Sequence, residues 1–201
     1  MTSVTSEPGA APTRRSADGR RRVIDAALAQ FAEYGVEGTS LQMIADAMGV
    51  TKAAVYYHFK TKDEIVLAVV RPALEQLRVI LADAEAQRGQ SARARAFLTG
   101  FVRLVVGERE LLTLLYDDVA VIRTLRVHWP DFEDFERRIP LVLAAPDAGP
   151  GHQVAAAVAI TGIVAAAGSP QFTTLSDDEL EGHLLDAGLR LLTARRRPGR
   201  H

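Results

Sequence analysis

The sequence predicts an all-α protein, and three patterns support this fold class. Apolar residues recur at positions i, i+3, i+4 and i+7, as at Ile24, Ala27, Leu28 and Phe31, which is the spacing of one helix face. Helix-start sequences recur along the chain. No stretch of four or more residues alternates polar and apolar side chains with β-branched enrichment, so no strand is predicted.

About nine helices are expected from these signals. They are placed at residues 17–34, 40–47, 51–58, 62–87, 91–108, 110–126, 130–145, 152–167 and 177–195. Capping boxes, in which Ser or Thr precedes Glu or Gln by three positions, begin at Thr39, Thr61 and Ser176. Gly35 and Gly49 follow the first two helices as stop signals.

Breaks in this pattern divide the chain into regions. Pro72 lies inside the fourth helix and should bend or split it, because proline removes a backbone hydrogen bond. We expect a helix-turn-helix domain at 17–75 and a helical body for ligand binding and dimerisation at 76–195. Residues 1–16 and the basic tail 196–201 are predicted to be disordered.

Composition excludes several classes of protein. The chain has 201 residues, of which 48% are hydrophobic and none is cysteine, so zinc–thiolate sites, iron–sulfur clusters, disulfides and thiol catalysis are excluded. Residues 1–19 lack the apolar stretch of a signal peptide, and the longest apolar run, 154–167, is too short to span a bilayer. These features predict a cytoplasmic protein without a membrane partner.

Charge is distributed unevenly along the chain. Residues 1–62 hold eight Lys or Arg against six Asp or Glu, whereas residues 63–194 hold twelve against nineteen. All three lysines, Lys52, Lys60 and Lys62, lie within eleven residues of one another. The pattern favours a polyanion-binding head on an acidic body, with a chance distribution as the alternative.

The segment 40–59, SLQMIADAMGVTKAAVYYHF, has the form of a helix-turn-helix. A tight turn at Gly49 separates two short helices, and Thr51 caps the second. In this motif the N-terminal residues of the second helix meet base edges in the major groove of DNA. Here Thr51, Lys52 and Ala53 offer a hydroxyl, a cation suited to guanine and a methyl suited to thymine.

Polar and charged side chains follow these predicted base readers. Tyr56, Tyr57 and His58 can donate to phosphate oxygens, and Lys60 and Lys62 supply positive charge beside them. The alternative is a capped helix pair inside an ordinary α-bundle. One short helix cannot bury all of these polar residues, so phosphate contact is the simpler explanation.

Residues 20–67 resemble the TetR family of bacterial transcriptional regulators. The resemblance rests on the opening helix VIDAALAQFAEYGVEGTS, the helix-turn-helix and the following KTKDEI. It implies a three-helix DNA-binding head, a helical ligand-binding and dimerisation body, and action mainly as a repressor that a small molecule relieves. The paired heads of the predicted dimer would bind a palindromic operator. By position in the family pattern, the implied phosphate contacts are Thr39, Ser40, Tyr56, Tyr57, His58 and Lys62.

The body should contain the ligand pocket, whose ligand the sequence does not identify. Apolar walls with a few orienting polar groups are typical of small-molecule sites. The candidate lining residues are Phe101, Arg103, Tyr116, Asp117, Arg123, His128, Trp129 and Phe132. Each of them also fits a core, surface or rim position.

The last two predicted helices are candidates for a homodimer interface. The eighth has a nearly smooth face of small residues, and the ninth is apolar on two sides, one of which needs a partner. The predicted interface residues are Ala155, Ala159, Gly162, Ala166, Leu180, Leu184 and Leu191. The alternative is a central helix covered entirely by its own chain.

Two other functions remain as alternatives. An enzyme is disfavoured, because the adjacent Asp117 and Asp118 point about 100° apart on a helix and the five histidines show no i, i+3 or i, i+4 pairing. We therefore predict no catalytic residue, no metal and no cofactor. The other alternative is an architectural DNA-binding protein without a ligand, against which a sizeable cavity in the body would count.

Overall fold

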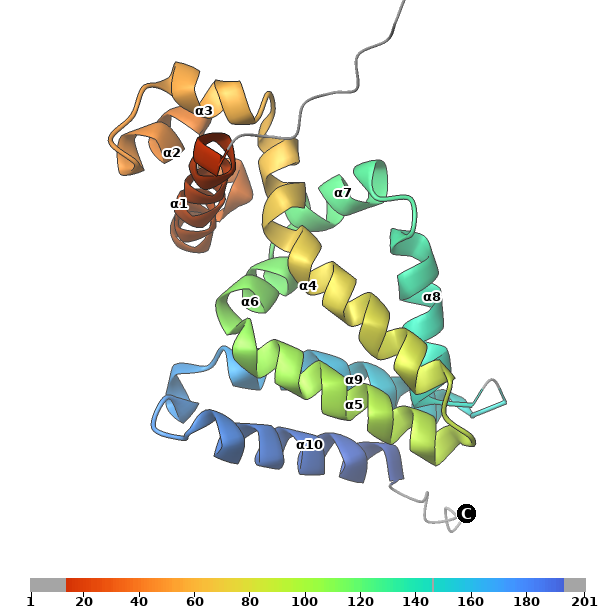
Figure 1. Cartoon of the computed structure of the whole chain (residues 1–201). Coiled ribbons are helices and arrows are strands. Elements are labelled where there is room, and N and C mark those ends of the chain that lie inside the picture. Colours follow the sequence, from red (N-terminus) through yellow and green to blue (C-terminus); the bar gives the residue numbers. More distant parts are fainter. Residues whose placement is uncertain (1–13, 146, 194–201) are drawn as a thin grey trace, which may run out of the picture.

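The computed structural model describes residues 14–145 and 147–193, and these form ten α-helices and one 3-10 turn without a strand (Figure 1). The predicted all-α class is confirmed. The prediction that residues 1–13 and 196–201 are disordered concerns residues outside the described ranges. Residues 14–16 were expected to be disordered, but they form the first turn of a helix.

Three helices form a head at one end of the molecule (Figure 1). They are α1 (Arg14–Gly38), α2 (Leu41–Ala47) and α3 (Lys52–His58). Helix α1 is broken at Gly35, whose φ of 70° and ψ of 166° are accessible to glycine because it has no side chain. The head encloses a small apolar core of Val23, Ala27, Phe31, Ile44, Val55 and Phe59.

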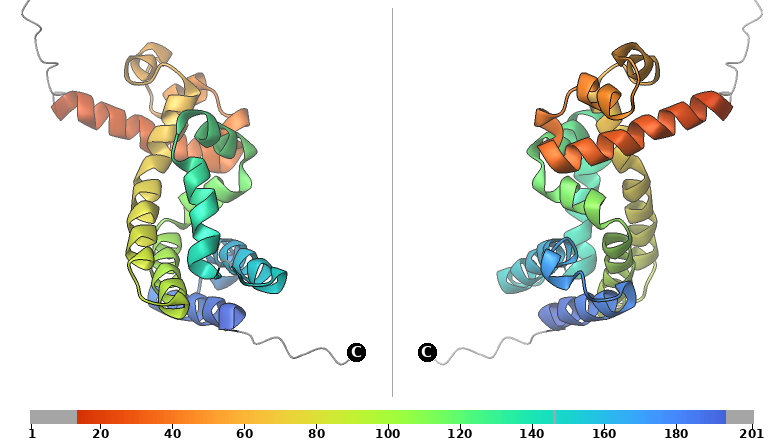
Figure 2. Two further views of the ribbon diagram at one scale, coloured as in Figure 1. Left: turned by 90° about the vertical axis from the view of Figure 1, so that its right-hand side faces the viewer. Right: turned by 90° about the vertical axis from the view of Figure 1, so that its left-hand side faces the viewer.

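The longest body helix, α4 (Lys62–Glu85), begins in the head and runs along one side of the body (Figure 2). It continues through Pro72 as one helix and is not split. It packs along α5 (Gln90–Gly107) at very close range. A Cβ atom at Gly100 would lie 2.8 Å from Ile80 Cγ2, so this approach requires glycine.

The body continues with α6 (Arg109–Asp117), α7 (Val119–His128) and α8 (Phe132–Leu143). The segment 110–126, expected to be one helix, is divided at Asp118. Asp118 has extended backbone angles, and its carboxylate accepts a hydrogen bond from Ala120 N at 2.8 Å, so it ends α6 and caps α7. This division accounts for the additional helix.

The last helices are α9 (Pro150–Ala167) and α10 (Asp177–Thr193), joined through the 3-10 turn η1 (Pro170–Phe172). They lie with α5 at the end of the molecule distant from the head (Figures 1 and 2). By length and composition alone α9 could cross a membrane. In the structure it packs against α5, α6, α8 and α10, so we interpret it as a body helix.

Candidate DNA-binding surface and ligand cavity

The helix-turn-helix is held by local caps and a glycine turn. Ser40 Oγ accepts from Met43 N at 3.2 Å, and Thr51 Oγ1 accepts from Ala54 N at 3.3 Å. Gly49, between the two helices, has a φ of 66°. Both cap hydroxyls are exposed and keep their own hydrogens for donation to a phosphate or a base.

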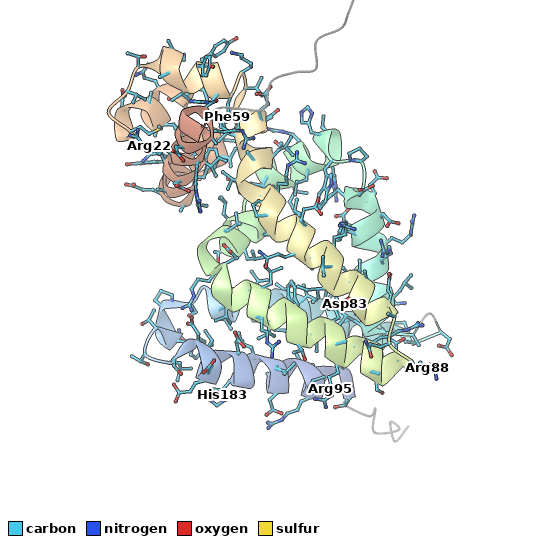
Figure 3. All side chains as sticks on the ribbon, viewed as in Figure 1. Arg22, Phe59, Asp83, Arg88, Arg95 and His183 are labelled. Carbon is cyan, nitrogen blue, oxygen red and sulfur yellow. The ribbon has the colours of Figure 1, made fainter. Side chains whose placement is uncertain are left out.

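One side of α3 is buried and the other faces solvent (Figure 3). Val55 and Phe59 pack into the head, as predicted, and are at most 2% exposed. Thr51, Lys52 and Ala53 are exposed at the start of α3, and Tyr57, near its end, is 71% exposed. The outward face of α3 therefore presents a hydroxyl, an ammonium, a methyl and a phenol with few contacts inside the protein.

The end of α3 is braced against its surroundings. The His58 ring packs so closely on α1 that a Cβ atom at Gly19 would lie 2.6 Å from its Nε2. The Lys60 ammonium donates to the Tyr56 carbonyl at 2.7 Å and lies 4.7 Å from the centroid of the Tyr56 ring. Such contacts fix Tyr56, Lys60 and His58 beside the exposed face of α3.

Arg20 is a cation at this surface that the sequence interpretation missed. Its guanidinium lies 4.6 Å from the centroid of the Phe59 ring, which is within the range of a cation–π contact. Arg20 is exposed on α1, as are Arg21 and Arg22. The run of three arginines was the available signal in the sequence.

Two predicted phosphate contacts are instead used inside the head. Thr39 is 2% exposed, and its hydroxyl donates to the carbonyls of Gln30 and Gly35; the cap of α2 is Ser40, one residue later. Lys62 Nζ donates to the carbonyls of Val36, Glu37 and Thr39 at 2.6, 3.3 and 3.1 Å. An ammonium has three donors, so in this structure all three donors of Lys62 are occupied inside the head, and its predicted phosphate contact stays a prediction.

The body contains a cavity of about 440 Å³ between α4, α5, α6, α7, α8 and α9. Its walls are apolar except for Glu136, Gln153 and Thr161. The other lining residues are Leu74, Leu77, Phe101, Leu112, Ile122, Leu125, Trp129, Phe132, Phe135, Ile139, Pro140, Leu143, Ala156, Ala157 and Ile160. A cavity of this size and lining is typical of a small-molecule site.

Aromatic rings form one wall of this cavity. The Trp129 ring centroid lies 5.2 Å from that of Phe135 and 6.4 Å from that of Phe132. The carboxylate of Glu136 accepts from Arg126 Nη2 at 2.9 Å, so its charge is partly compensated. This wall of the cavity is therefore aromatic, with an ion-paired carboxylate beside it.

Three of the predicted lining residues, Phe101, Trp129 and Phe132, border this cavity. The sequence interpretation missed most of the aliphatic wall because it selected polar and aromatic residues, whereas most of the lining comes from helix faces that look like ordinary core. Tyr116 and Asp117 lie on α6, and the prediction that their side chains line the cavity lies outside what the structure describes.

The other three predicted lining residues face elsewhere, which corrects that prediction. Arg103 is exposed on α5, with Nε 3.9 Å from a carboxylate oxygen of Glu181. His128 lies 3.5 Å from Asp63. Arg123 forms an ion pair with Glu37, in which the guanidinium lowers the pKa of the Glu37 carboxyl. These side chains lie where body and head meet or on the surface.

The predicted interface residues divide into inward and outward groups. Ala159, Leu180 and Leu184 are 1%, 3% and 7% exposed within the single chain, so their assignment to an interface is wrong. Ala155 and Ala166 are half-buried, whereas Gly162 and Leu191 are exposed. The sequence interpretation therefore took three of its seven candidates from the inward sides of the two helices.

An outward apolar stripe on α9 replaces the one that was predicted. Val154 and Val158 are 61% and 50% exposed, and the exposed Gly162 and Ala165 continue the same stripe. Large apolar side chains seldom remain this exposed side by side on one helix without a partner.

Comparison with known proteins identifies the head. Residues 23–69 match the model of the N-terminal domain described as bacterial regulatory proteins, tetR family. A probable acrEF/envCD operon repressor of Escherichia coli is 32% identical over 102 residues, which cover 48% of this chain and 46% of that protein. The HTH-type transcriptional repressor Rv1474c of Mycobacterium tuberculosis is 27% identical over 130 residues, which cover 64% of this chain and 63% of that protein. The chain thus matches between about half and two thirds of the length of these relatives.

Solved structures extend the likeness over the body. SCO3833, a TetR-family member from Streptomyces coelicolor, aligns with a TM-score of 0.67 at 22% identity, covering 85% of this chain and 88% of that one. The ketosteroid transcriptional regulator KstR2 of Mycobacterium tuberculosis aligns with a TM-score of 0.65 at 20% identity, covering 85% and 92%. At these identities the likeness shows the fold alone. The head, residues 23–69, therefore matches the TetR family of bacterial regulatory proteins, and the described head and body together have the fold of solved members of that family.

Proposed function

We propose that the protein is a cytoplasmic transcriptional repressor that binds a palindromic DNA operator as a homodimer and releases it when a small molecule enters the cavity. The observation that carries this proposal is the exposed face of α3, with Thr51, Lys52 and Ala53 at its start. The N-terminal residues of the second helix are the ones that read base edges in a helix-turn-helix.

Phosphate contacts would come from the groups around α3. Ser40 begins α2, Tyr56, Tyr57 and His58 lie on the last turn of α3, and Lys60 follows it. Arg20 adds a cation from α1. Such contacts fix the register of a protein on the duplex, whereas Thr51, Lys52 and Ala53 would provide the sequence preference.

Dimerisation would use the outward faces of α9 and α10. Val154, Val158 and Gly162 on α9, together with Leu191 on α10, form an exposed and largely apolar surface. A two-fold pair of such helix hairpins gives a four-helix interface, and paired heads match the two half-sites of a palindrome.

The effector would occupy the cavity between α4 and α9. Its volume of about 440 Å³ and its apolar walls suit a compact, mostly hydrophobic molecule, with Gln153 and Thr161 available to orient a polar group. This cavity also favours a ligand-responsive regulator over an architectural DNA-binding protein.

Selection of DNA by the purified protein tests the proposal. From a pool of random duplexes the protein should enrich one palindromic sequence, and its affinity for that duplex should fall steeply as salt rises, because phosphate contacts release counterions. The control Arg78→Ala, which removes an exposed charge on the body part of α4, should bind like the wild type. A protein that enriches no sequence, or whose binding does not depend on salt, would contradict the proposed function.

A further inference from the structure

One carboxylate joins the head to the body. The backbone N–H of Val36, at the end of α1, donates to Asp118 Oδ2 at 2.6 Å. The backbone N–H of Ala120, at the start of α7, donates to Asp118 Oδ1 at 2.8 Å. Each oxygen of Asp118 therefore holds a different helix end, and the two ends come from different parts of the fold.

The break at Gly35 makes this contact possible. With a φ of 70°, Gly35 turns the chain out of the helix, which leaves the Val36 N–H free to donate outside α1. A Cβ atom at Gly35 would lie 3.4 Å from Asp118 Oδ2, so the carboxylate rests directly on the glycine. The contact thus depends on the backbone at one defined point of the head.

The same helix that Asp118 caps also forms a wall of the cavity. Ile122, Leu125 and Trp129 line the cavity, and they follow Asp118 at i+4, i+7 and i+11. Residues at this spacing form one stripe along a helix. The rise from Asp118 to Leu125 is only about 10 Å along the axis, so a shift of the wall reaches the head contact through a single short, rigid element.

We propose that Asp118 is the positioning residue that sets the orientation of the head on the body, and that α7 carries a displacement of the cavity wall to the head through it. This inference rests on the proposed function, in which an occupant of the cavity weakens DNA binding. The route lies beside α4, which also reaches from the cavity, at Leu74 and Leu77, to the head.

A second polar contact at the joint provides a matched control. Arg123 of α7 pairs with Glu37 of α1, but both side chains are about 65% exposed. Exposed ion pairs contribute little, because solvent screens them and two long side chains must be ordered. Glu37→Gln removes this pair and leaves the contact between Asp118 and Val36 intact.

The variant Asp118→Asn tests the head contact without removing the cap. Asparagine caps helices as well as aspartate does, but its amide has one oxygen where the carboxylate has two. When that oxygen accepts from Ala120, the NH₂ group faces the Val36 N–H, and no hydrogen bond forms there. Ile122→Trp serves as an internal stand-in for an occupant, since it adds bulk to the cavity wall of α7.

The head orientation can be measured directly because the chain has no cysteine. Spin labels attached at Ala29→Cys in α1 and Ser91→Cys in α5 occupy exposed positions on the head and the body. Mixing with excess unlabelled chain leaves one labelled chain per dimer, and double electron–electron resonance then gives the head-to-body distance distribution.

We expect Ile122→Trp to shift this distance by about 2 Å and to weaken binding of the selected duplex about tenfold. In the Asp118→Asn background the distribution should be broader, and Ile122→Trp should neither shift it nor weaken binding further. This non-additivity measures coupling, which loss of stability alone would not produce. In the Glu37→Gln background, Ile122→Trp should still shift the distance and weaken DNA binding as it does in the wild type.

The inference is overturned if Ile122→Trp has the same effect in both Asp118 backgrounds or no effect in either. If Ile122→Trp does not fold, the smaller Ile122→Phe takes its place, with the same outcomes. The distance measurement needs no DNA, so it separates two failures. A wild-type protein that selects no duplex contradicts the proposed function, whereas an unchanged response in Asp118→Asn contradicts only the role of Asp118.

Discussion

Both carboxylate oxygens of Glu85 accept hydrogen bonds from Arg138, at 2.9 Å from Nε and 2.6 Å from Nη2. Asp134, one turn before Arg138 on α8, accepts from Nη1 at 2.9 Å. This paired arrangement joins the end of α4 to α8, the helix that carries Phe132 and Phe135 of the cavity wall. The Arg138 guanidinium lowers the pKa of both carboxyls below their ordinary values.

These lowered pKa values predict how stability depends on pH. A carboxyl whose pKa is lower in the folded chain than in the unfolded chain stabilises the fold at pH values above the unfolded pKa. For Glu85 this unfolded pKa is the ordinary value of 4.5. That contribution is lost as pH falls through the folded value. Arg138→Gln should therefore lower the free energy of unfolding near pH 7 by about 1 kcal/mol or less, since the groups are about one third exposed. The difference from the wild type should shrink below pH 4.5.

Urea unfolding at a series of pH values measures this effect. The control Arg78→Gln removes the exposed pair with Glu75 on α4 and should differ little from the wild type at any pH. The free energy of unfolding of Arg138→Gln could instead differ from that of the wild type by the same amount above and below pH 4.5. That result would contradict the ionic origin of the contact.

Lys62 should matter for the stability of the head and not for the salt dependence of DNA binding. Its ammonium binds three carbonyls where α1 ends, a position at which a positive charge is also favoured by the helix dipole. Lys62→Met should lower the free energy of unfolding by about 1.5–3 kcal/mol, as hydrogen bonds to charged groups do. Denaturant unfolding measures the loss of stability. The slope of DNA affinity against salt concentration, measured on the same preparation, shows whether the salt dependence is unchanged. A stable variant with a flatter slope would restore Lys62 as a phosphate contact.

Lys52 and Lys60 should have separable effects on DNA binding. Lys52→Ala, at the start of α3, should relax the preference at one base pair, at a cost of about 1–3 kcal/mol for the selected duplex. Lys60→Ala should weaken all duplexes alike and reduce the salt slope by about one per protomer. Titrations of the selected duplex and of single-base variants at several salt concentrations distinguish the two. Identical profiles for both variants would contradict the separation of base readers from phosphate contacts.

The dimer should depend on the outward stripe of α9. Val158→Arg places a charge in the middle of this exposed apolar stripe, and we expect monomers in sedimentation velocity and loss of palindrome binding. Val79→Arg, at a position that is 52% exposed on α4, is the matched control and should remain dimeric. Leu184→Arg should instead destabilise the monomer, because Leu184 is 7% exposed within its own chain. A Val158→Arg variant that sediments as a dimer would exclude this face.

The sequence by itself determined the features that arise from neighbouring residues. Gly35 and Gly49 break the chain at positive φ, where the stop signals were located. The box at Ser176 forms as predicted, with Glu179 N donating to Ser176 Oγ at 3.3 Å and Ser176 N donating to the Glu179 carboxylate at 2.9 Å. Such interactions span three or four residues, so a short stretch of sequence specifies them. The period of apolar residues likewise specifies helices and the buried side of α3.

Only the tertiary structure decided which polar groups are free and which apolar stripe faces inward. Lys62 appears in the sequence as a cation beside the helix-turn-helix, but its three acceptors lie 23 to 26 residues earlier in the chain. Asp118 meets the Val36 N–H across 82 residues. Helix α10 carries two apolar stripes and packs against α5 and α9. This packing buries Leu180 and Leu184, whereas Leu191 remains exposed. Partners of this kind are set by the close packing of whole helices, because a side chain far from its partner in sequence meets it only after the intervening elements have assembled.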